Sequence, residues 1–310
     1  MTSQRCQADE MSSLAPRSVG AAELAKTIIR RSNKNKGDKS CKWVQLATVS
    51  PAGLPRARTV VLREVVAPGS RADLPQHCWG ITMITDARST KIRDFAAQPV
   101  AELLWLLSRT SEQFRVFGRV TVVGPAHPSE TQTFGTEGPC ATSECNARAL
   151  HELRLQAWGR MKPGAQAQML WPHPGQPKQS SLSNTAARGD RPGEGAAADS
   201  SQCSRSAAHN PGAVSPLAAA EDAQGTLGEH SGPAPPDNFV LLLLRPAVVD
   251  HLELKSNCRH VYFLPSAAPL AEHLCLSGGV EEQPLTADAA SAALQACETE
   301  SDYQCLEVNA

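Results

Sequence analysis

The sequence has few aromatic residues and no long apolar run. Phe, Trp and Tyr make up 4% of its 310 residues, whereas 41% are hydrophobic, which is enough for a folded core. The longest strongly apolar run is about Phe239 to Leu244, far short of the ~20 residues that a membrane-spanning helix needs. We therefore expect a globular chain that does not contact a membrane.

An excess of charge of either sign is also missing. The 30 basic and 31 acidic side chains give a net charge of -1 with neutral histidines. Such a chain has no broad electrostatic attraction for a polyanion. We expect no binding to nucleic acid.

The sequence lacks the spacings that are typical of disulfide scaffolds and zinc sites. The ten cysteines are scattered, with no C-x-x-C pair, and the nine histidines include no pair at zinc spacing. We expect reduced thiols and no metal site.

The N-terminus has no apolar segment of the signal-peptide type. Asp9 and Glu10 argue against a transit peptide, whereas Arg5, Arg17 and several serines are compatible with one. We expect a cytoplasmic protein, with a plastid or another organelle as the alternative.

Residues 173–236 are poor in side chains that build a core. They include no Phe, Tyr, Trp, Ile or Met and consist mainly of Ala, Ser, Gly, Pro and Gln. This composition cannot offset the roughly 1–2 kcal/mol per residue that ordering the backbone costs. We predict a disordered insertion between two parts of one domain, and two separate domains are the alternative. The predicted organisation is a flexible N-terminus over 1–18, the first part of the domain over 19–172, the insertion, and the completion of the domain with a C-terminal segment over 237–310.

The remaining sequence alternates between strand and helix patterns. Apolar residues at helical spacing predict a helix over residues 19–34. Runs rich in β-branched residues predict strands over Trp43 to Val49, Thr59 to Val66, Trp79 to Thr85, Ala101 to Leu107, Gln113 to Val123, Phe239 to Leu244 and Val249 to Leu254. About seven strands, mostly at hairpin spacing and with helices at the margins, predict a mainly β fold, a closed or nearly closed antiparallel barrel.

A short helix is predicted after Ser89 and ends before Pro99. Its first turns carry Lys91 and Arg93. Cations are unfavourable at the positive end of a helix unless an anion is also bound there. This placement indicates an anion site.

Polar residues that could hold such an anion occur nearby. Arg58 and Arg63 bracket the apolar run of RTVVLR, and strand alternation places them on opposite faces unless a bulge intervenes. Together with Thr85, Ser89 and Lys91 they could bind a phosphate through cationic and hydroxyl groups. The alternative is that these residues are solvated strand ends and a surface helix.

Five sequence motifs in a fixed order carry a resemblance to a known family. They are WVQLATVSPAGLPRARTVVLR, ITDARSTKIRDFAAQPVAELLWLL, SEQFRVFGRV, WPHPGQP and PPDNFVLLLLRPAVVDHLELKSN. The chain resembles the pyridoxamine 5'-phosphate oxidase family, in its oxidase-like FMN-binding branch, over roughly residues 20–175 and 236–262. The resemblance implies an FMN-binding split β-barrel and a homodimer in which two subunits form each flavin site.

The resemblance also implies roles for individual residues. Arg58 and Lys91 would contact the FMN phosphate, with Ser89 in the same loop. The residues assigned to the rest of the cofactor site are Thr59, Arg63, Thr85, Gln113 and Arg259. One departure is that Ser89-Thr90-Lys91 stands where the family often has Ser-Arg-Lys, so one phosphate cation is missing and FMN affinity could be lower.

The substrate side matches the family less well. The helix that holds the substrate phosphate in the oxidase corresponds to a segment with Lys162, and the C-terminal Arg-x-His pair falls on Lys255 and Asn257. We expect an FMN-dependent oxidoreductase that passes a hydride from a small molecule, pyridoxamine or pyridoxine 5'-phosphate, to flavin N5, with no catalytic side chain. The alternatives are an FMN-dependent reductase of another small molecule and a non-catalytic flavin-binding or interaction protein.

Overall fold

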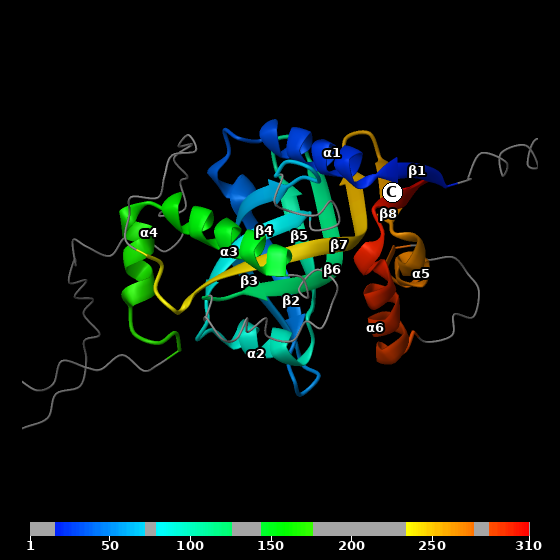
Figure 1. Ribbon diagram of the computed structural model, residues 1–310. Coiled ribbons are helices and arrows are strands. Elements are labelled where there is room, and N and C mark those ends of the chain that lie inside the picture. The colour runs from blue at the N-terminus through cyan, green and yellow to red at the C-terminus, as the bar shows by residue number, and fades with distance from the viewer. Residues whose placement is uncertain (1–15, 72–78, 126–143, 176–233, 276–284, 310) are drawn as a thin grey trace, which may run out of the picture.

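The computed structural model describes residues 16–71, 79–125, 144–175, 234–275 and 285–309 (Figure 1). Within these ranges the strands are β1 (Arg17–Gly20), β2 (Trp43–Val49), β3 (Pro55–Val66), β4 (Gly80–Asp86), β5 (Val100–Leu107), β6 (Glu112–Val123), β7 (Phe239–Glu253), β8 (Cys258–Phe263) and β9 (Asp302–Asn309). The α-helices are α1 (Ala21–Asn33), α2 (Thr90–Ala97), α3 (Glu144–Gly159), α4 (Pro163–Ala167), α5 (Ala268–Cys275) and α6 (Ala287–Ala296). Short 3-10 helices are η2 (Lys39–Lys42), η4 (Gln168–Leu170), η6 (Pro265–Ala267) and η7 (Cys297–Thr299).

Six strands close into an antiparallel barrel. The sheet order runs β7-β4-β3-β2-β5-β6, and β6 pairs again with β7, so that the ring has no free edge. The interior is filled by residues that alternate along the strands, such as Leu46 of β2, Leu62 of β3 and Met83 of β4, which are at most 5% exposed. The predicted mainly β barrel with flanking helices is therefore confirmed, and its architecture is that of a split β-barrel.

Helices cover the ends and one side of the barrel. In Figure 1, α1 lies above the barrel and α2 lies below it. α1 buries Leu24 and Ile28, which lie one turn apart on one face. α3 packs Leu150 and Leu153 against outward-facing residues of β7. Within the described ranges, no helix is both long and apolar enough to span a membrane.

The two predicted strands between residues 239 and 254 are in fact one strand, and that prediction is wrong. β7 runs unbroken from Phe239 to Glu253 and pairs with β4 through its first half and with β6 along its length. Pro246, which lies between the two predicted strands, is opposite Gly118, where the register between β6 and β7 shifts. Because a bulge tolerates the missing proline N–H, the strand continues through it.

Three strands extend the sheet beyond the barrel. β8, β9 and β1 follow β7 in that order, with α5 and α6 beside them in Figure 1. No pattern in the sequence predicted any of these three strands. β9 alternates between buried residues, Tyr303 and Cys305, and more exposed neighbours, which is the ordinary pattern of a strand with one covered face.

Segments far apart in the sequence share the barrel. β7, which follows residues 176–233, pairs with β4 and β6, which precede them. The predicted disordered insertion (173–236) and flexible N-terminus (1–18) lie outside the described residues, apart from 16–18, 173–175 and 234–236. The four-part division of the chain stays a prediction.

Candidate functional site

The loop that enters α2 is fixed by its own side chains. Asp86 ends β4, and its carboxylate accepts hydrogen bonds from the backbone N–H of Arg88 at 2.7 Å and from the amide of Asn238 at 2.9 Å. The guanidinium of Arg88 pairs with the same carboxylate at 2.7 Å. Ser89 directly precedes α2 and is its N-cap residue, but its hydroxyl makes no capping hydrogen bond to the helix.

Lys91 holds this hydroxyl instead. Its Nζ donates to the Oγ of Ser89 at 3.1 Å and to the Oγ1 of Thr85 at 2.8 Å. Burial, and next the charge of Arg58, lower the pKa of Lys91 to about 8, although two carboxylates nearby act in the opposite direction. A partly buried cation beside a second cation favours an anion.

Arg58 reaches the same end of the barrel from β3. Its Nη1 donates to the Oγ1 of Thr48 at 2.7 Å, and its Nη2 lies 3.3 Å from Oδ2 of Asp94. Asp94 of α2 is fully buried and also accepts from the hydroxyl of Thr48 at 2.8 Å. Arg56 lies 3.4 Å from the other carboxylate oxygen. Asp94 therefore fastens α2 to the barrel through two arginines and a threonine.

The net positive charge of this cluster can balance a bound dianion. Arg56, Arg58 and Lys91 carry three positive charges and Asp94 carries one negative charge, so the cluster has a net charge of about +2 at pH 7. A phosphate monoester carries about -1.5 to -2 at that pH. The first turn of α2 has no acidic residue and includes Lys91. The residues present therefore fit the phosphate of FMN.

Four of the predicted cofactor residues, Arg58, Thr85, Ser89 and Lys91, are thus brought together, whereas the others lie elsewhere. Thr59 is exposed on the outer face of β3, beside Arg58 in sequence. Gln113 is on β6, opposite Leu106 of β5, and so also faces outward. A register shift between Leu62 and Glu64 adjusts β3 locally, but Arg63 still lies outside the barrel.

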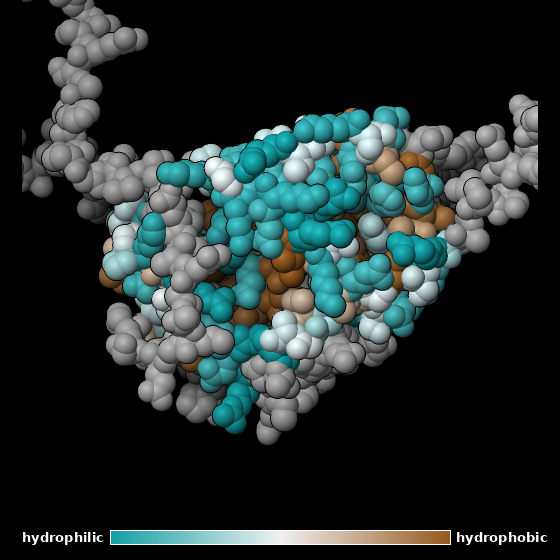
Figure 2. Space-filling model, turned by 90° about the horizontal axis from the view of Figure 1, so that it is seen from above, coloured by the Kyte–Doolittle hydropathy of each residue, from teal (hydrophilic) through white to brown (hydrophobic). Residues whose placement is uncertain are grey.

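Arg63 lines a cavity of about 440 Å³ between α1, α3 and the outer face of β3 and β4. Its other polar lining residues include Lys36, Glu64 and Arg160. Figure 2 shows a mostly hydrophilic face that is hollowed near its centre, where hydrophobic residues form the floor. This space is separate from the cluster at the α2 end, since the two share no lining residue.

The last cofactor residue and the predicted substrate residues are spread over the chain. Arg259 of β8 pairs with Asp250 at 2.8 and 3.0 Å. Lys162 is exposed at the N-cap of α4. Lys255 and Asn257 lie in the β7–β8 turn, where Lys255 donates to the backbone oxygen of Arg109 at 3.3 Å and Asn257 has φ 52°. α4 and this turn lie on different sides of the barrel in Figure 1. Within one chain, Lys162 is therefore not close to Lys255 and Asn257.

Sequence reasoning missed Thr48, Arg56 and Asp94. A signal existed for Asp94, which lies one turn after Lys91 on the predicted helix and directly before Phe95, a buried residue. Arg56 and Arg58 are two residues apart on one strand and therefore share a face. Nothing in the sequence indicated that this face meets α2.

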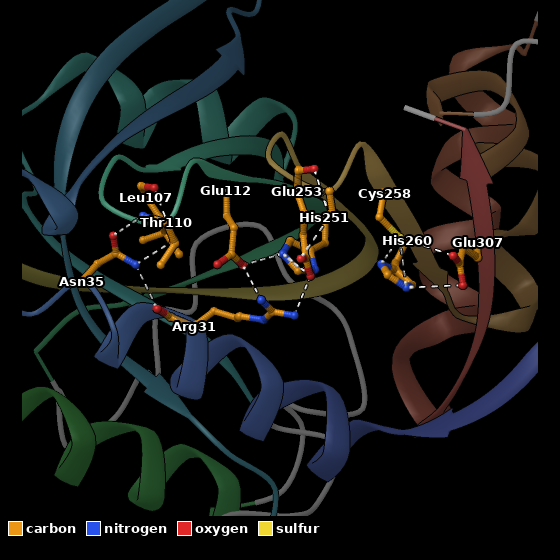
Figure 3. Close-up of polar contacts among 11 residues, drawn as sticks. Arg31, Asn35, Leu107, Thr110, Glu112, His251, Glu253, Cys258, His260 and Glu307 are labelled. Atoms are coloured by element: carbon orange, nitrogen blue, oxygen red, sulfur yellow. Dashed lines mark hydrogen bonds and ion pairs between the residues drawn. The ribbon is translucent and has the colours of Figure 1, made fainter.

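A second buried polar network connects α1 to the barrel (Figure 3). The Nε2 of His251 lies 2.8 Å from Oε2 of Glu112, and both side chains are nearly inaccessible, at 1% and 3%. Arg31 of α1 lies 3.4 Å from that Glu112 oxygen and 2.5 Å from Oε1 of Glu253. The ring of His251 stacks on Phe114 at 4.2 Å. This network is distinct from the α2 cluster, and its two carboxylates share one arginine and His251.

Comparisons with known proteins support the interpretation of the barrel. The family model described as pyridoxamine 5'-phosphate oxidase, FMN-binding domain, matches residues 22–124. Pyridoxine/pyridoxamine 5'-phosphate oxidase 2 of Arabidopsis thaliana is 28% identical over 217 residues, which cover 70% of this chain and 76% of that protein.

Two solved structures are similar in part. A pyridoxamine 5'-phosphate oxidase-related, FMN-binding protein of Nostoc punctiforme is 26% identical, with a TM-score of 0.48, and the match covers 77% of this chain and 89% of that one. PhzG of Burkholderia lata is 14% identical, with a TM-score of 0.42 and coverage of 77% and 84%. From α1 through β6, residues 22–124 thus match the FMN-binding domain of the pyridoxamine 5'-phosphate oxidase family.

Proposed function

We propose that this chain is an FMN-dependent oxidoreductase of the pyridoxamine 5'-phosphate oxidase type. The observation that carries the proposal is the convergence of Arg58 and Lys91, with two hydroxyl groups, at the N-terminus of α2. When bound, FMN supplies the redox chemistry, because its ring accepts a hydride from the substrate and is reoxidised by molecular oxygen. The chain supplies binding, orientation and electrostatics.

We assign the cluster to the FMN phosphate. Lys91 and Arg58 provide the charge, and the hydroxyls of Thr85 and Ser89, which now accept from Lys91, can turn their protons toward a phosphate oxygen. Asp94 keeps Arg58 at the end of the barrel and is too deeply buried to meet a ligand. Three of the four residues come from β4 and the start of α2, so the loop between them determines the geometry.

The other assigned residues require a second copy of the chain in this proposal. Arg63, Thr59, Gln113 and Arg259 lie on outer faces of the sheet, where a partner protomer can approach. A homodimer would also bring Lys162 of one protomer and Lys255 with Asn257 of its partner toward one flavin. We keep these residues as candidates for flavin and substrate orientation.

The substrate we propose is pyridoxine or pyridoxamine 5'-phosphate, since the relative from Arabidopsis thaliana is an oxidase of that name. One observation favours a different small molecule. Lys255 and Asn257 stand where the pyridoxamine 5'-phosphate oxidase family has its Arg-x-His pair. Lys255 also donates a hydrogen bond to the backbone oxygen of Arg109. An FMN-dependent reductase is therefore the second candidate, and a flavin-binding protein without turnover is the third.

The test combines cofactor binding with reduction. We expect the purified protein to be yellow and dimeric, and the double variant R58A/K91M to lose FMN. R93A is the matched control, because Arg93 is an exposed cation on the same helix. Candidate substrates are then added without oxygen. Bleaching of the flavin by pyridoxine or pyridoxamine 5'-phosphate, with formation of the aldehyde in air, supports the oxidase.

Two outcomes would contradict the proposal in different ways. A colourless protein that takes up no FMN would refute the cofactor site. Bound FMN that no substrate bleaches but a reduced nicotinamide does would point to the reductase.

A further inference from the structure

Three side chains of the types that ligate metals converge on the sheet extension beyond the barrel. Cys258 and His260 are two residues apart on β8 and therefore project from one face. Glu307 of β9 is the cross-strand partner of His260. Figure 3 shows the three side chains pointing toward one another. Their donor atoms all lie within 4.8 Å of one another.

The separations between these atoms are close to those of a tetrahedral zinc site. Sγ of Cys258 lies 3.3 Å from Oε1 of Glu307 and 3.8 Å from Nε2 of His260, and Nε2 lies 3.8 Å from Oε2 of Glu307. With Zn–S of about 2.3 Å and Zn–N or Zn–O of about 2.0–2.2 Å, a tetrahedral ion requires donor separations of about 3.4–3.6 Å. Because Cys258 and His260 contact different oxygens of Glu307, a rotation of that exposed carboxylate together with small shifts of the other donor atoms would complete the site.

Neighbouring groups hold the imidazole in place. The ring of His260 lies between those of His251 and Tyr262, at centroid distances of 6.1 and 6.3 Å. His251 and Glu253 are themselves engaged with Glu112 and Arg31. They could also form a ligand group with His260, but their charges and hydrogen bonds are already used by Glu112 and Arg31. Neighbouring residues that fix the orientation of a ligating imidazole ring support metal binding.

The site is open on one side. The side chain of Glu307 is 71% exposed and that of His260 is 25% exposed. β1 pairs with β9 from Asp302 to Cys305, so its ladder ends before Glu307. Arg259, which is assigned to the flavin, lies on the opposite face of β8 and pairs with Asp250. The cluster is thus independent of the cofactor assignment.

We propose that Cys258, His260 and Glu307 bind a Zn²⁺ ion, with water in the fourth position. A thiolate, an imidazole and a carboxylate form a mixed soft and hard set that suits Zn²⁺ rather than Mg²⁺ or Ca²⁺. Binding breaks the S–H bond of Cys258, releases the proton to solvent and forms the Zn–S bond, without any change of oxidation state. The ion joins β8 to the end of the C-terminal strand.

Protection of the thiol tests this proposal. The full-length protein is treated with iodoacetamide with and without one equivalent of Zn²⁺, and alkylation of Cys258 is followed by peptide mass spectrometry. We expect Zn²⁺ to slow this alkylation by about tenfold or more, and H260Q and E307Q to lose the protection. The matched controls H273Q and E272Q, which remove the same groups from α5, keep it.

A spectroscopic measurement on the unaltered chain covers the case in which a variant fails to fold. Co²⁺ replaces Zn²⁺, and the difference spectrum against the metal-free protein cancels flavin absorption. A thiolate-to-cobalt charge-transfer band is expected, and C258S should lack it. Absence of that band in the unaltered chain, no protection by tens of micromolar Zn²⁺, or protection that survives either H260Q or E307Q would overturn the proposal.

Discussion

Lys91 is a cation whose charge depends on pH near neutrality. Its pKa of about 8 results first from burial and then from the nearby charge of Arg58. A bound phosphate dianion favours the protonated form, so binding takes up a proton above pH 8. We expect FMN affinity to be highest between about pH 6, where the phosphate becomes dianionic, and about pH 8, and to fall by up to tenfold per unit above it.

Quenching of FMN fluorescence, measured from about pH 6 to about pH 10, checks this profile. K91M should bind more weakly and lose the dependence above pH 8, whereas R93M should keep it. A profile that is flat in the unaltered protein would mean that Lys91 does not contact the phosphate.

The pair of Glu112 and His251 predicts how acid acts on stability. Burial lowers the pKa of His251 below its ordinary 6.5, against the effect of Glu112. Burial opposes ionisation of Glu112, but hydrogen bonds from His251 and Thr110 and the charge of Arg31 outweigh it, so its pKa lies below 4.5. In both cases the unfolded chain binds protons more readily. The free energy of unfolding therefore decreases as the pH falls below about 6.5, and decreases further below about 4.5.

Urea unfolding at a series of pH values measures this decrease. E112Q should lower the free energy of unfolding by about 1–3 kcal/mol at neutral pH, because His251 and Arg31 lose a charged acceptor. It should also flatten the acid limb. E23Q is the control, since Glu23 is an exposed carboxylate on α1 that also pairs with an arginine. Equal acid limbs in E112Q and E23Q would contradict the assignment.

For single residues, the sequence predicted which side chains could bind a phosphate better than it predicted which residues surround them. Arg58, Thr85, Ser89 and Lys91 could be proposed as a phosphate site because a short motif places cations at a helix start. Asp94 could not, because its burial depends on how α2 meets β2 and β3. Arg259 was expected at the flavin, but within one chain its guanidinium is satisfied by Asp250, a contact between strands that spacing does not reveal.

Among the elements, the pairing of β6 with β7 leaves the least room for an added side chain, at Gly118. A Cβ at Gly118 would lie 1.9 Å from the backbone oxygen of Arg245. Because the obstacle is backbone in a central pair of strands, it cannot move away cheaply. We expect G118A to lower the free energy of unfolding by about 3 kcal/mol or more. G124A, where no atom lies within 4 Å of the added methyl group, is the control and should change it little.

Denaturant unfolding of both variants provides the measurement, and similar midpoints for G118A and G124A would disprove the close approach. The same pairing explains why two strands were predicted where β7 is one continuous strand. A proline between two apolar runs ordinarily separates strands, and only the pairing partner shows that Pro246 sits at a bulge. β8, β9 and β1 were not predicted because the sequence pattern of a short strand is weak without knowledge of the strands that pair with it.

On the scale of the whole molecule, the barrel joins two parts of the chain that are distant in sequence. β4 and β6 belong to the first part and β7 to the second, and β7 contacts both over most of its length. The sequence correctly indicated a barrel because hairpin spacing is local. It could not indicate which strands close the ring, since β6 and β7 meet across more than a hundred residues.

This arrangement predicts that residues 176–233 are dispensable. Family-like sequence stands on both sides of them, and their composition offers little to a core. Replacing them with about 12 Gly and Ser residues should preserve FMN binding and raise the free energy of unfolding by about 1 kcal/mol, because a shorter loop costs less entropy to close. Limited proteolysis should cut this segment first. The two fragments should then remain associated through the β4–β7 and β6–β7 ladders and elute together with FMN on gel filtration. Release of the flavin or separation of the fragments would show instead that the segment contributes to the fold, and the division of the chain into one interrupted domain would be wrong.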